Sequence, residues 1–248
     1  MIFPRYAVFI LMATTLICNG CIFERIFRVK KQLCDVEENF QIEVRPGFRV
    51  ILREPVMLDE DITWLAGAEP SGQMLAGDQL VMTYLAERKS APSEEKYDLP
   101  IKLQFVRLEG EYRLKEGYLG ENLADLLTVE LLTQLMQSVC ESEKSLVKQH
   151  VIIDISSLDR TLLPNRSEIT RILGPPNPNS NRGQRLVYDY EFKNNDAEDI
   201  AAVIEIYFDD SDNRPDRLKL KYLRYHLDAD FKKGVAILKV DIFEKKDT

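Results

Sequence analysis

The chain has 248 residues, of which 45% are apolar and 30% charged, with 33 Lys and Arg against 41 Asp and Glu. This length and apolar content suffice for one large domain or two small ones with a buried core, which excludes wholesale disorder. The formal charge of −8 argues against a nucleic-acid binder, because neutralising phosphates needs a basic face.

The first twenty residues are typical of a lipoprotein signal peptide. Arg5 precedes an uncharged, mostly apolar run from Tyr6 to Ile17. That run is too short to span a bilayer permanently but long enough for a secretory signal. Gly20 then precedes Cys21, a pattern that resembles the bacterial lipobox, although Cys18 stands where Leu is usual. We expect cleavage after residue 20 and lipidation at Cys21; a plain cleaved signal and an uncleaved helix are the alternatives.

Lipidation at Cys21 would make the membrane a partner of the chain. The resemblance to bacterial lipoproteins implies a diacylglyceryl group and an amide-linked chain such as palmitate, and several acyl chains anchor stably. Ile22 stands where Asp would be the common signal for inner-membrane retention. The expected location is therefore the periplasmic face of the cell outer membrane. Loss of Arg5 leaves the mature chain at about −9 (−8 − 1), which favours solubility.

The rest of the first half predicts helices and strands in a definite order. Apolar residues recur at helical spacing between residues 22 and 36, and alternate between 40 and 52 around a Pro46-Gly47 turn. A short helix is expected over residues 60–66, with Asp59 as its cap and Gly67 as its stop. A polar loop over residues 69–78 and strands at 79–86, 101–107 and 112–119 complete the half.

The second half predicts a similar order. Glu121 to Cys140 carries leucine at every fourth position, which favours one long amphipathic helix packed on the core. A strand-like segment over residues 147–155 leads to a short helix over 166–173, capped by Asn165 and stopped by Gly174. Strands are expected at 185–192, 202–208, 217–226 and 235–243.

Blocks of the first half recur in the second in the same order. Four pairs align at offsets of 103–107: ITWLAGAEP with ITRILGPP, QLVMTYL with RLVYDYE, IKLQF with IEIYF, and RLKEGYL with RLKLKYL. Tandem duplication explains such ordered matches better than chance. We therefore predict an α+β fold of two tandem repeats, residues 21–120 and 121–248. Each repeat is expected to have a long helix, strands, a short helix and an antiparallel meander, with the helices packed on one face of the sheet.

The second short helix and its following strands carry a recognisable pattern. SEITRILGPPN, LVYDYEF and IEIYF, within residues 165–227, resemble the SmpA/OmlA family. That family contains the small lipoprotein of the outer-membrane β-barrel assembly machinery, and the β-lactamase inhibitory protein uses a related fold in tandem. The resemblance implies a helix ending in Leu-Gly-x-Pro, an aromatic-rich strand and an antiparallel meander. It is specific for fold rather than function, and no functional residue is carried over from it.

Two cysteines remain once Cys18 leaves with the signal and Cys21 carries lipid. Cys34 and Cys140 lie 106 residues apart, at the ends of matching predicted helices. In the oxidising periplasm an even pair suggests a disulfide. The bond forms if the two halves pack about a pseudo-two-fold axis, because equivalent residues near that axis meet. If translation relates the halves, both thiols stay free, as buried cysteines often are.

Motifs of catalysis are absent from the mature sequence, so no catalytic residue, metal or cofactor is expected. Asp209, Asp210, Asp212 and Asp216 fail the spacing of a calcium loop and are interpreted as a solvated turn. The carboxylates of residues 59–61 are interpreted as favourable charges at a helix start rather than as an acid–base pair.

Two regions are candidates for binding. Trp64 is the single tryptophan; a buried position is the commoner fate, but an exposed one would be a strong hot-spot candidate. A polar loop stiffened by prolines is the second candidate, with Pro175, Pro176, Asn177 and Arg182 as its binding residues. The paired sheet faces of the two repeats form a third possible surface.

These observations favour a non-enzymatic, lipid-anchored interaction or scaffold protein that assists envelope or outer-membrane protein assembly. Its expected partners are the membrane, through the lipid, and an envelope protein, but no nucleic acid. One alternative is an inhibitor of a periplasmic enzyme, which would need no lipid. Another is a cell-envelope enzyme without a recognisable motif, which would show converging carboxylates in a pocket.

Overall fold

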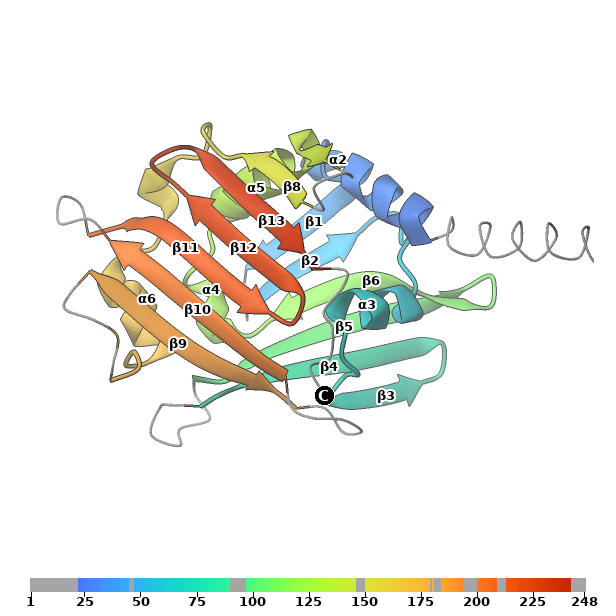
Figure 1. The fold of residues 1–248 in the computed structure, drawn as a ribbon. Helices are drawn as coiled ribbons and strands as arrows, with labels where there is room; N and C mark the ends of the chain where they lie inside the picture. The colour runs from blue at the N-terminus through green and yellow to red at the C-terminus, as the bar shows by residue number, and fades with distance from the viewer. Residues whose placement is uncertain are drawn as a thin grey trace, which may run out of the picture.

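The computed structural model describes residues 22–44, 47–89, 97–145, 150–178, 180, 184–193, 200–208 and 213–241 (Figure 1). The predicted signal peptide, Cys21 and Arg182 lie outside these residues. Strands dominate the described chain, because segments with alternating apolar and polar residues make up most of it. The strands are β1 (Phe40–Val44), β2 (Phe48–Leu52), β3 (Gly72–Ala76), β4 (Gln79–Arg88), β5 (Leu99–Leu108), β6 (Glu111–Leu119), β7 (Glu143–Ser145), β8 (His150–Asp154), β9 (Arg185–Phe192), β10 (Ile200–Phe208), β11 (Pro215–Tyr222), β12 (Tyr225–Asp230) and β13 (Val235–Val240).

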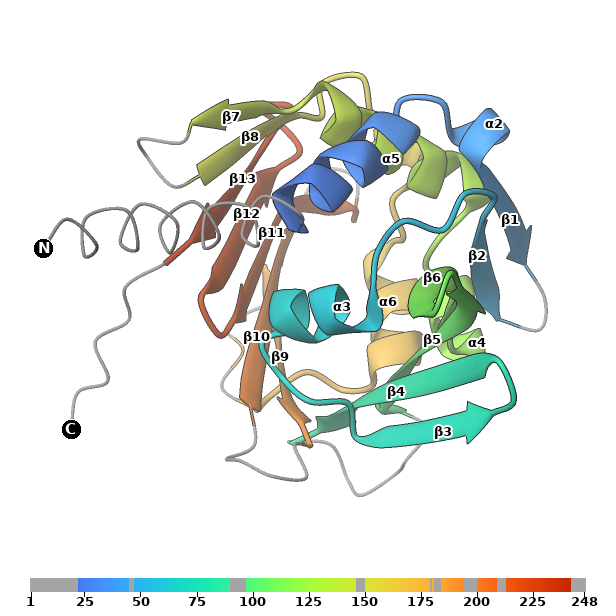
Figure 2. The same ribbon diagram turned by 90° about the vertical axis from the view of Figure 1, so that its right-hand side faces the viewer.

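The helices are few and short. A helix over residues 22–32 opens the described chain. The others are α2 (Val36–Asn39), α3 (Asp59–Ala66), α4 (Glu121–Ala124), α5 (Val129–Glu141), α6 (Arg166–Leu173) and a 3₁₀ turn (Arg160–Leu162). In Figure 2 the sheet curves around α3, α5, α6 and the N-terminal helix.

All thirteen strands of the described residues belong to one antiparallel sheet. Its order is β1-β2-β6-β5-β4-β9-β10-β11-β12-β13-β8-β7, with β3 paired to β4 outside this path. The two halves of the chain meet where Ala86 of β4 pairs with Phe192 of β9 and Arg88 pairs with Tyr190. The sheet therefore runs through the boundary between the predicted repeats without a break.

The predicted α+β fold of two helix-packed repeats is wrong, because the chain is mostly one large antiparallel sheet with few helices. The reason lies in β4. This strand has ten residues. On one edge, residues 79–83 pair with β3, which leaves residues 86–88 to pair with β9. An unpaired strand edge carries unsatisfied backbone groups, so joining the halves removes two such edges. The aligned blocks themselves lie on α3 and α6, β4 and β9, β5 and β10, and β6 and β11.

Arg88 fixes this junction. Its guanidinium carbon lies 4.9 Å from the ring centroid of Tyr188 and 5.4 Å from that of Tyr190. The guanidinium also donates a hydrogen bond to the Asp189 carbonyl at 2.8 Å. The side chain is almost fully buried, and burial lowers the pKa of the guanidinium. The aromatic faces and the carbonyl compensate for the lost hydration of the charge.

Capping explains where the predicted helices are wrong. The helix expected from Glu121 to Cys140 is broken into α4 and α5, because the Thr128 hydroxyl accepts from the Leu131 N–H and starts a new helix. The helix expected over residues 22–36 stops at residue 32, and Asp35 caps the separate α2. Hydrophobic periodicity continues through both breaks and therefore does not reveal them.

Strand predictions also need corrections. The expected polar loop over residues 69–78 contains β3, which pairs with β4. The single strand expected at residues 217–226 is two strands, β11 and β12, joined by a turn in which Leu223 has positive φ. The segment expected over 147–155 contributes β8, which pairs with β7 and β13.

Four apolar clusters form the core between helices and sheet. Ile169 and Ile172 of α6 pack on Leu186 and Tyr188 of β9. Ile62 of α3 packs near β4 and β5. The helix α5 contributes to the two remaining clusters, which lie under β8, β12 and β13 and beside β1 and β2. The helices α3, α5 and α6 thus bury apolar residues on strands, and such burial supplies the main favourable free energy of folding.

A disulfide joins Cys34 to Cys140, with the two Cα atoms 5.1 Å apart. It links the segment after the N-terminal helix to the last turn of α5, and so joins the first predicted repeat to the second. The Lys30 ammonium donates to the Ser142 carbonyl at 2.6 Å beside it.

Candidate interaction surface at Trp64

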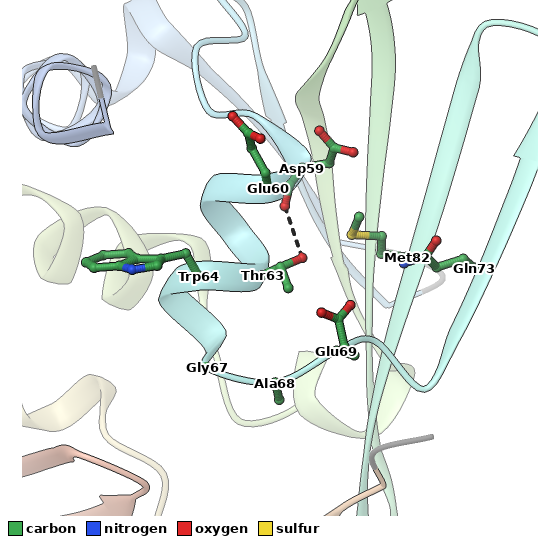
Figure 3. Close-up of a pocket in the computed structure, with 9 residues that line it drawn as sticks. All are labelled: Asp59, Glu60, Thr63, Trp64, Gly67, Ala68, Glu69, Gln73 and Met82. Atoms are coloured by element: carbon green, nitrogen blue, oxygen red, sulfur yellow. Dashed lines mark hydrogen bonds between the residues drawn. The ribbon is translucent and has the colours of Figure 1, made fainter. Parts of the chain in front are cut away.

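The candidate site surrounds the helix α3. A pocket of about 570 Å³ lies between this helix and the strands β3 and β4. It is lined by Asp59, Glu60, Thr63, Trp64, Gly67, Ala68, Glu69, Gln73 and Met82. In Figure 3, Thr63 and Glu69 face Met82 across this pocket, and Trp64 projects from the other side of the helix.

Trp64 is 47% exposed. The ring of Phe23 meets it edge to face, with the centroids 6.4 Å apart. The guanidinium carbon of Arg224 lies 5.0 Å from the Trp64 centroid and 5.3 Å from that of Tyr225. The two contacts to the indole come from opposite ends of the sequence and restrict its orientation.

The last turn of α3 is held by side chains from the β11–β12 turn. Tyr222 and Tyr225 donate to the carbonyls of Ala66 and Leu65, each at 2.8 Å, and Arg224 donates to the Trp64 carbonyl at 3.2 Å. The last carbonyls of a helix lack partners within it, so these donors satisfy them. Burial raises the pKa of Tyr222 to about 12, which keeps the hydroxyl protonated as a donor.

Gly67 ends α3 in the left-handed conformation, at φ 64°. A Cβ at this position would come within 2.8 Å of the Leu223 side chain. The left-handed backbone therefore favours glycine here, and an added Cβ would also require the Leu223 side chain to move.

The first turn of α3 is held by Asp61. Its carboxylate accepts from the Leu58 N–H at 2.8 Å and receives two hydrogen bonds of 2.5 Å from the Arg25 guanidinium. Asp61 is 2% exposed. The sequence placed the cap at Asp59, whereas Leu58 occupies the N-cap position and Asp61 supplies the capping oxygen. Both ends of α3 are thus tied to other parts of the molecule.

The pocket has an acidic rim. Asp59, Glu60 and Glu69 line it, and Thr63 donates to the Asp59 carbonyl at 3.2 Å (Figure 3). Asp59 and Glu60 lie in the first turn of α3, where the positive end of the helix dipole favours carboxylates. The pocket offers negative charge and an apolar floor at Met82, which suits a basic side chain with an aliphatic stem.

The proline loop lies elsewhere and is engaged in structural contacts. Asn177 accepts from Arg88 at 2.9 Å and donates to Asp189 at 2.6 Å, and the Pro175 carbonyl accepts from Arg88 at 3.2 Å. Pro175 is exposed and Pro176 half-buried. In Figure 1, α6, which precedes this loop, lies at the left of the view and α3 at the right. The structure does not bring these candidates together with Trp64.

Sequence reasoning missed Phe23, Tyr222, Arg224 and Tyr225 as parts of the site. Arg224 and Tyr225 lie about 160 residues from the α3 carbonyls that they contact. No local pattern in the sequence signals such a contact. Among the residues that the structure describes, no group of three or more metal-binding side chains lies together.

Comparisons with protein families, with curated proteins and with solved structures found no match to this chain. The resemblance of residues 165–227 to the SmpA/OmlA family therefore stays a prediction. We name Trp64, Arg224 and the residues that line the pocket the Trp64 surface.

Proposed function

We propose that this chain is a lipid-anchored interaction protein of the outer membrane, which presents the Trp64 surface to a protein partner during envelope or outer-membrane protein assembly. The observation that carries this proposal is an exposed tryptophan whose position is fixed from both ends of its helix. Tryptophan is enriched at the energetic centres of protein interfaces. A side chain that is already ordered loses little entropy on binding.

Charge supports a partner with a basic segment. The carboxylates of Asp59, Glu60 and Glu69 line the pocket that Trp64 also borders, and the whole chain carries −8. Complementary charge accelerates association and orients the partner. Within the described residues no helix is long and apolar enough to cross a membrane. We expect the acyl chains proposed at Cys21 to attach the protein to the membrane.

The role of Trp64 can be tested with a photo-reactive amino acid placed at that position in living cells. We expect crosslinks to an envelope protein from position 64 and none from Met74, a matched control that is 61% exposed on β3. Trp64→Ala should then weaken binding of the crosslinked partner about 30-fold or more, as truncation of a hot spot does, without loss of folding. Equal crosslinking from both positions would contradict the proposal.

The lipid anchor has a separate test. Cys21→Ser should abolish fatty-acid labelling and release the chain from membranes, or leave the signal uncut. Cys18→Ser is the matched control and should keep its label, because residue 18 leaves with the signal peptide. Continued labelling of the Cys21→Ser variant would refute the anchor. An enzyme inhibitor would retain its activity in that variant, whereas a membrane scaffold would lose function although folded.

A further inference from the structure

The helix over residues 22–32 begins directly after the proposed site of lipidation. Consecutive Cα atoms are about 3.8 Å apart, so acyl chains on Cys21 would leave no linker between the bilayer and Ile22. The side chains of this helix that face the membrane must therefore be compatible with contact with lipid headgroups.

One face of this helix is committed to the protein. Arg25 binds the buried Asp61, Lys30 donates to the Ser142 carbonyl, and Gln32 donates to the Glu54 carbonyl at 3.0 Å. The disulfide at Cys34 follows immediately. These contacts fix the rotation of the helix about its axis and determine which residues face outward.

The outward face combines aromatic and basic side chains. Phe23 and Phe27 are 61% and 60% exposed, four residues apart, and Arg28 and Lys31 are exposed beside them. Residues 22–32 contain four basic residues and one acidic residue, a net charge of +3 (4 − 1), in a chain of −8. Exposed phenylalanines flanked by basic residues are the composition of helices that lie in a membrane interface.

We infer that this outward face docks on an anionic phospholipid surface, with Phe23 and Phe27 among the headgroups and Arg28 and Lys31 against lipid phosphates. The inference rests on the proposed function, because Cys21 is the anchor that would bring the face to the bilayer. The acyl chains on Cys21 would hold the protein at the bilayer, and aromatic and basic groups beside them would orient it against the lipid surface. The acidic rim of the pocket would be repelled by anionic lipid, so it suits the protein partner instead.

The chain has one tryptophan, which allows a direct measurement. In a Trp64→Phe background, Phe23→Trp puts the indole on the outward face, and Met74→Trp puts it on β3, at the end of the molecule opposite the N-terminal helix (Figure 2). The full chain is added to vesicles of phosphatidylethanolamine and phosphatidylglycerol with brominated acyl chains. We expect several-fold stronger quenching and a blue-shifted emission for the indole at position 23. Equal quenching at both positions would overturn the inference.

Charge reversal separates lipid docking from protein docking. Arg28→Glu with Lys31→Glu should remove most of the quenching at position 23, and Arg53→Glu with Arg107→Glu, two other exposed arginines, should leave it unchanged. Unchanged quenching in the first pair refutes the electrostatic contact. The mass of the N-terminal peptide from the same samples shows whether Cys21 is acylated. Loss of the lipid anchor can therefore be told apart from loss of docking by the outward face. Crosslinking of position 23 to a protein, without quenching, would assign the face to a protein partner and refute lipid docking.

Discussion

Replacing Cys34 and Cys140 together by serine should lower the free energy of unfolding by about 4–5 kcal/mol in the chain-entropy model, since the bond closes a loop of 106 residues. The crosslink removes conformations from the unfolded chain, and longer loops lose more. The loss is measured by urea unfolding of the double variant and of the native chain, both without reductant.

A reductant provides the internal control. Dithiothreitol should bring the native chain to the stability of the double serine variant and leave that variant unchanged. The bond joins the segment after the N-terminal helix to α5, so hydrogen exchange should rise first in residues 22–32 and in α5. A difference below about 1 kcal/mol would show that the unfolded chain is already compact, because the entropic gain requires an expanded unfolded state.

Local signals in the sequence predicted local structure well. The helix α6 begins and ends where the sequence places it, because the Asn165 side chain accepts from the N–H groups of Ser167 and Glu168 and Gly174 stops it with positive φ. The Glu168 carboxylate accepts in turn from the Asn165 N–H at 2.7 Å. All these contacts lie within a few residues, so the sequence alone contains them.

Pairing between distant strands could not be predicted in the same way. The segments that become β4 and β9 show the same alternation, and alternation specifies a face rather than a neighbour. The contact of Arg88 with Tyr190 joins residues about 100 apart, and this contact makes one sheet from two predicted repeats. The sequence contained the strands but not the pairing that decides the architecture.

The candidate site, too, was predictable from the sequence only in its local features. Trp64 was a candidate because it is the single tryptophan, and the short helix that carries it was expected. Its exposure depends on Phe23 and Arg224, which approach from opposite ends of the chain. The proline loop was a candidate by composition, yet Asn177 binds the buried Arg88 and Asp189. Composition identifies polar residues but not whether the protein already uses them.

Asp61 should be the most sensitive single position near the Trp64 surface. It sits in the middle of the sequence Asp59-Glu60-Asp61-Ile62, whose acidic residues look equivalent in the sequence. The structure separates them: Glu60 is exposed, whereas Asp61 is buried and bound by both the Leu58 N–H and the Arg25 guanidinium. We expect Asp61→Ala to lower the free energy of unfolding by about 3–5 kcal/mol, because it leaves a largely buried cation without its partner.

A double-mutant cycle measures how much of this loss of stability comes from the interaction between Arg25 and Asp61. Arg25→Ala should also destabilise strongly, and the double variant should lose less than the sum, with a coupling energy of about 1–3 kcal/mol between the two residues. Glu60→Ala is the matched control and should change stability by less than about 0.5 kcal/mol, since the side chain is exposed. Because Arg25 lies on the N-terminal helix and Asp61 in the first turn of α3, which carries Trp64, loss of the pair should also free the indole. Its fluorescence anisotropy should fall in Asp61→Ala and stay unchanged in Glu60→Ala. Additive stability losses in the cycle would show that Arg25 and Asp61 act independently.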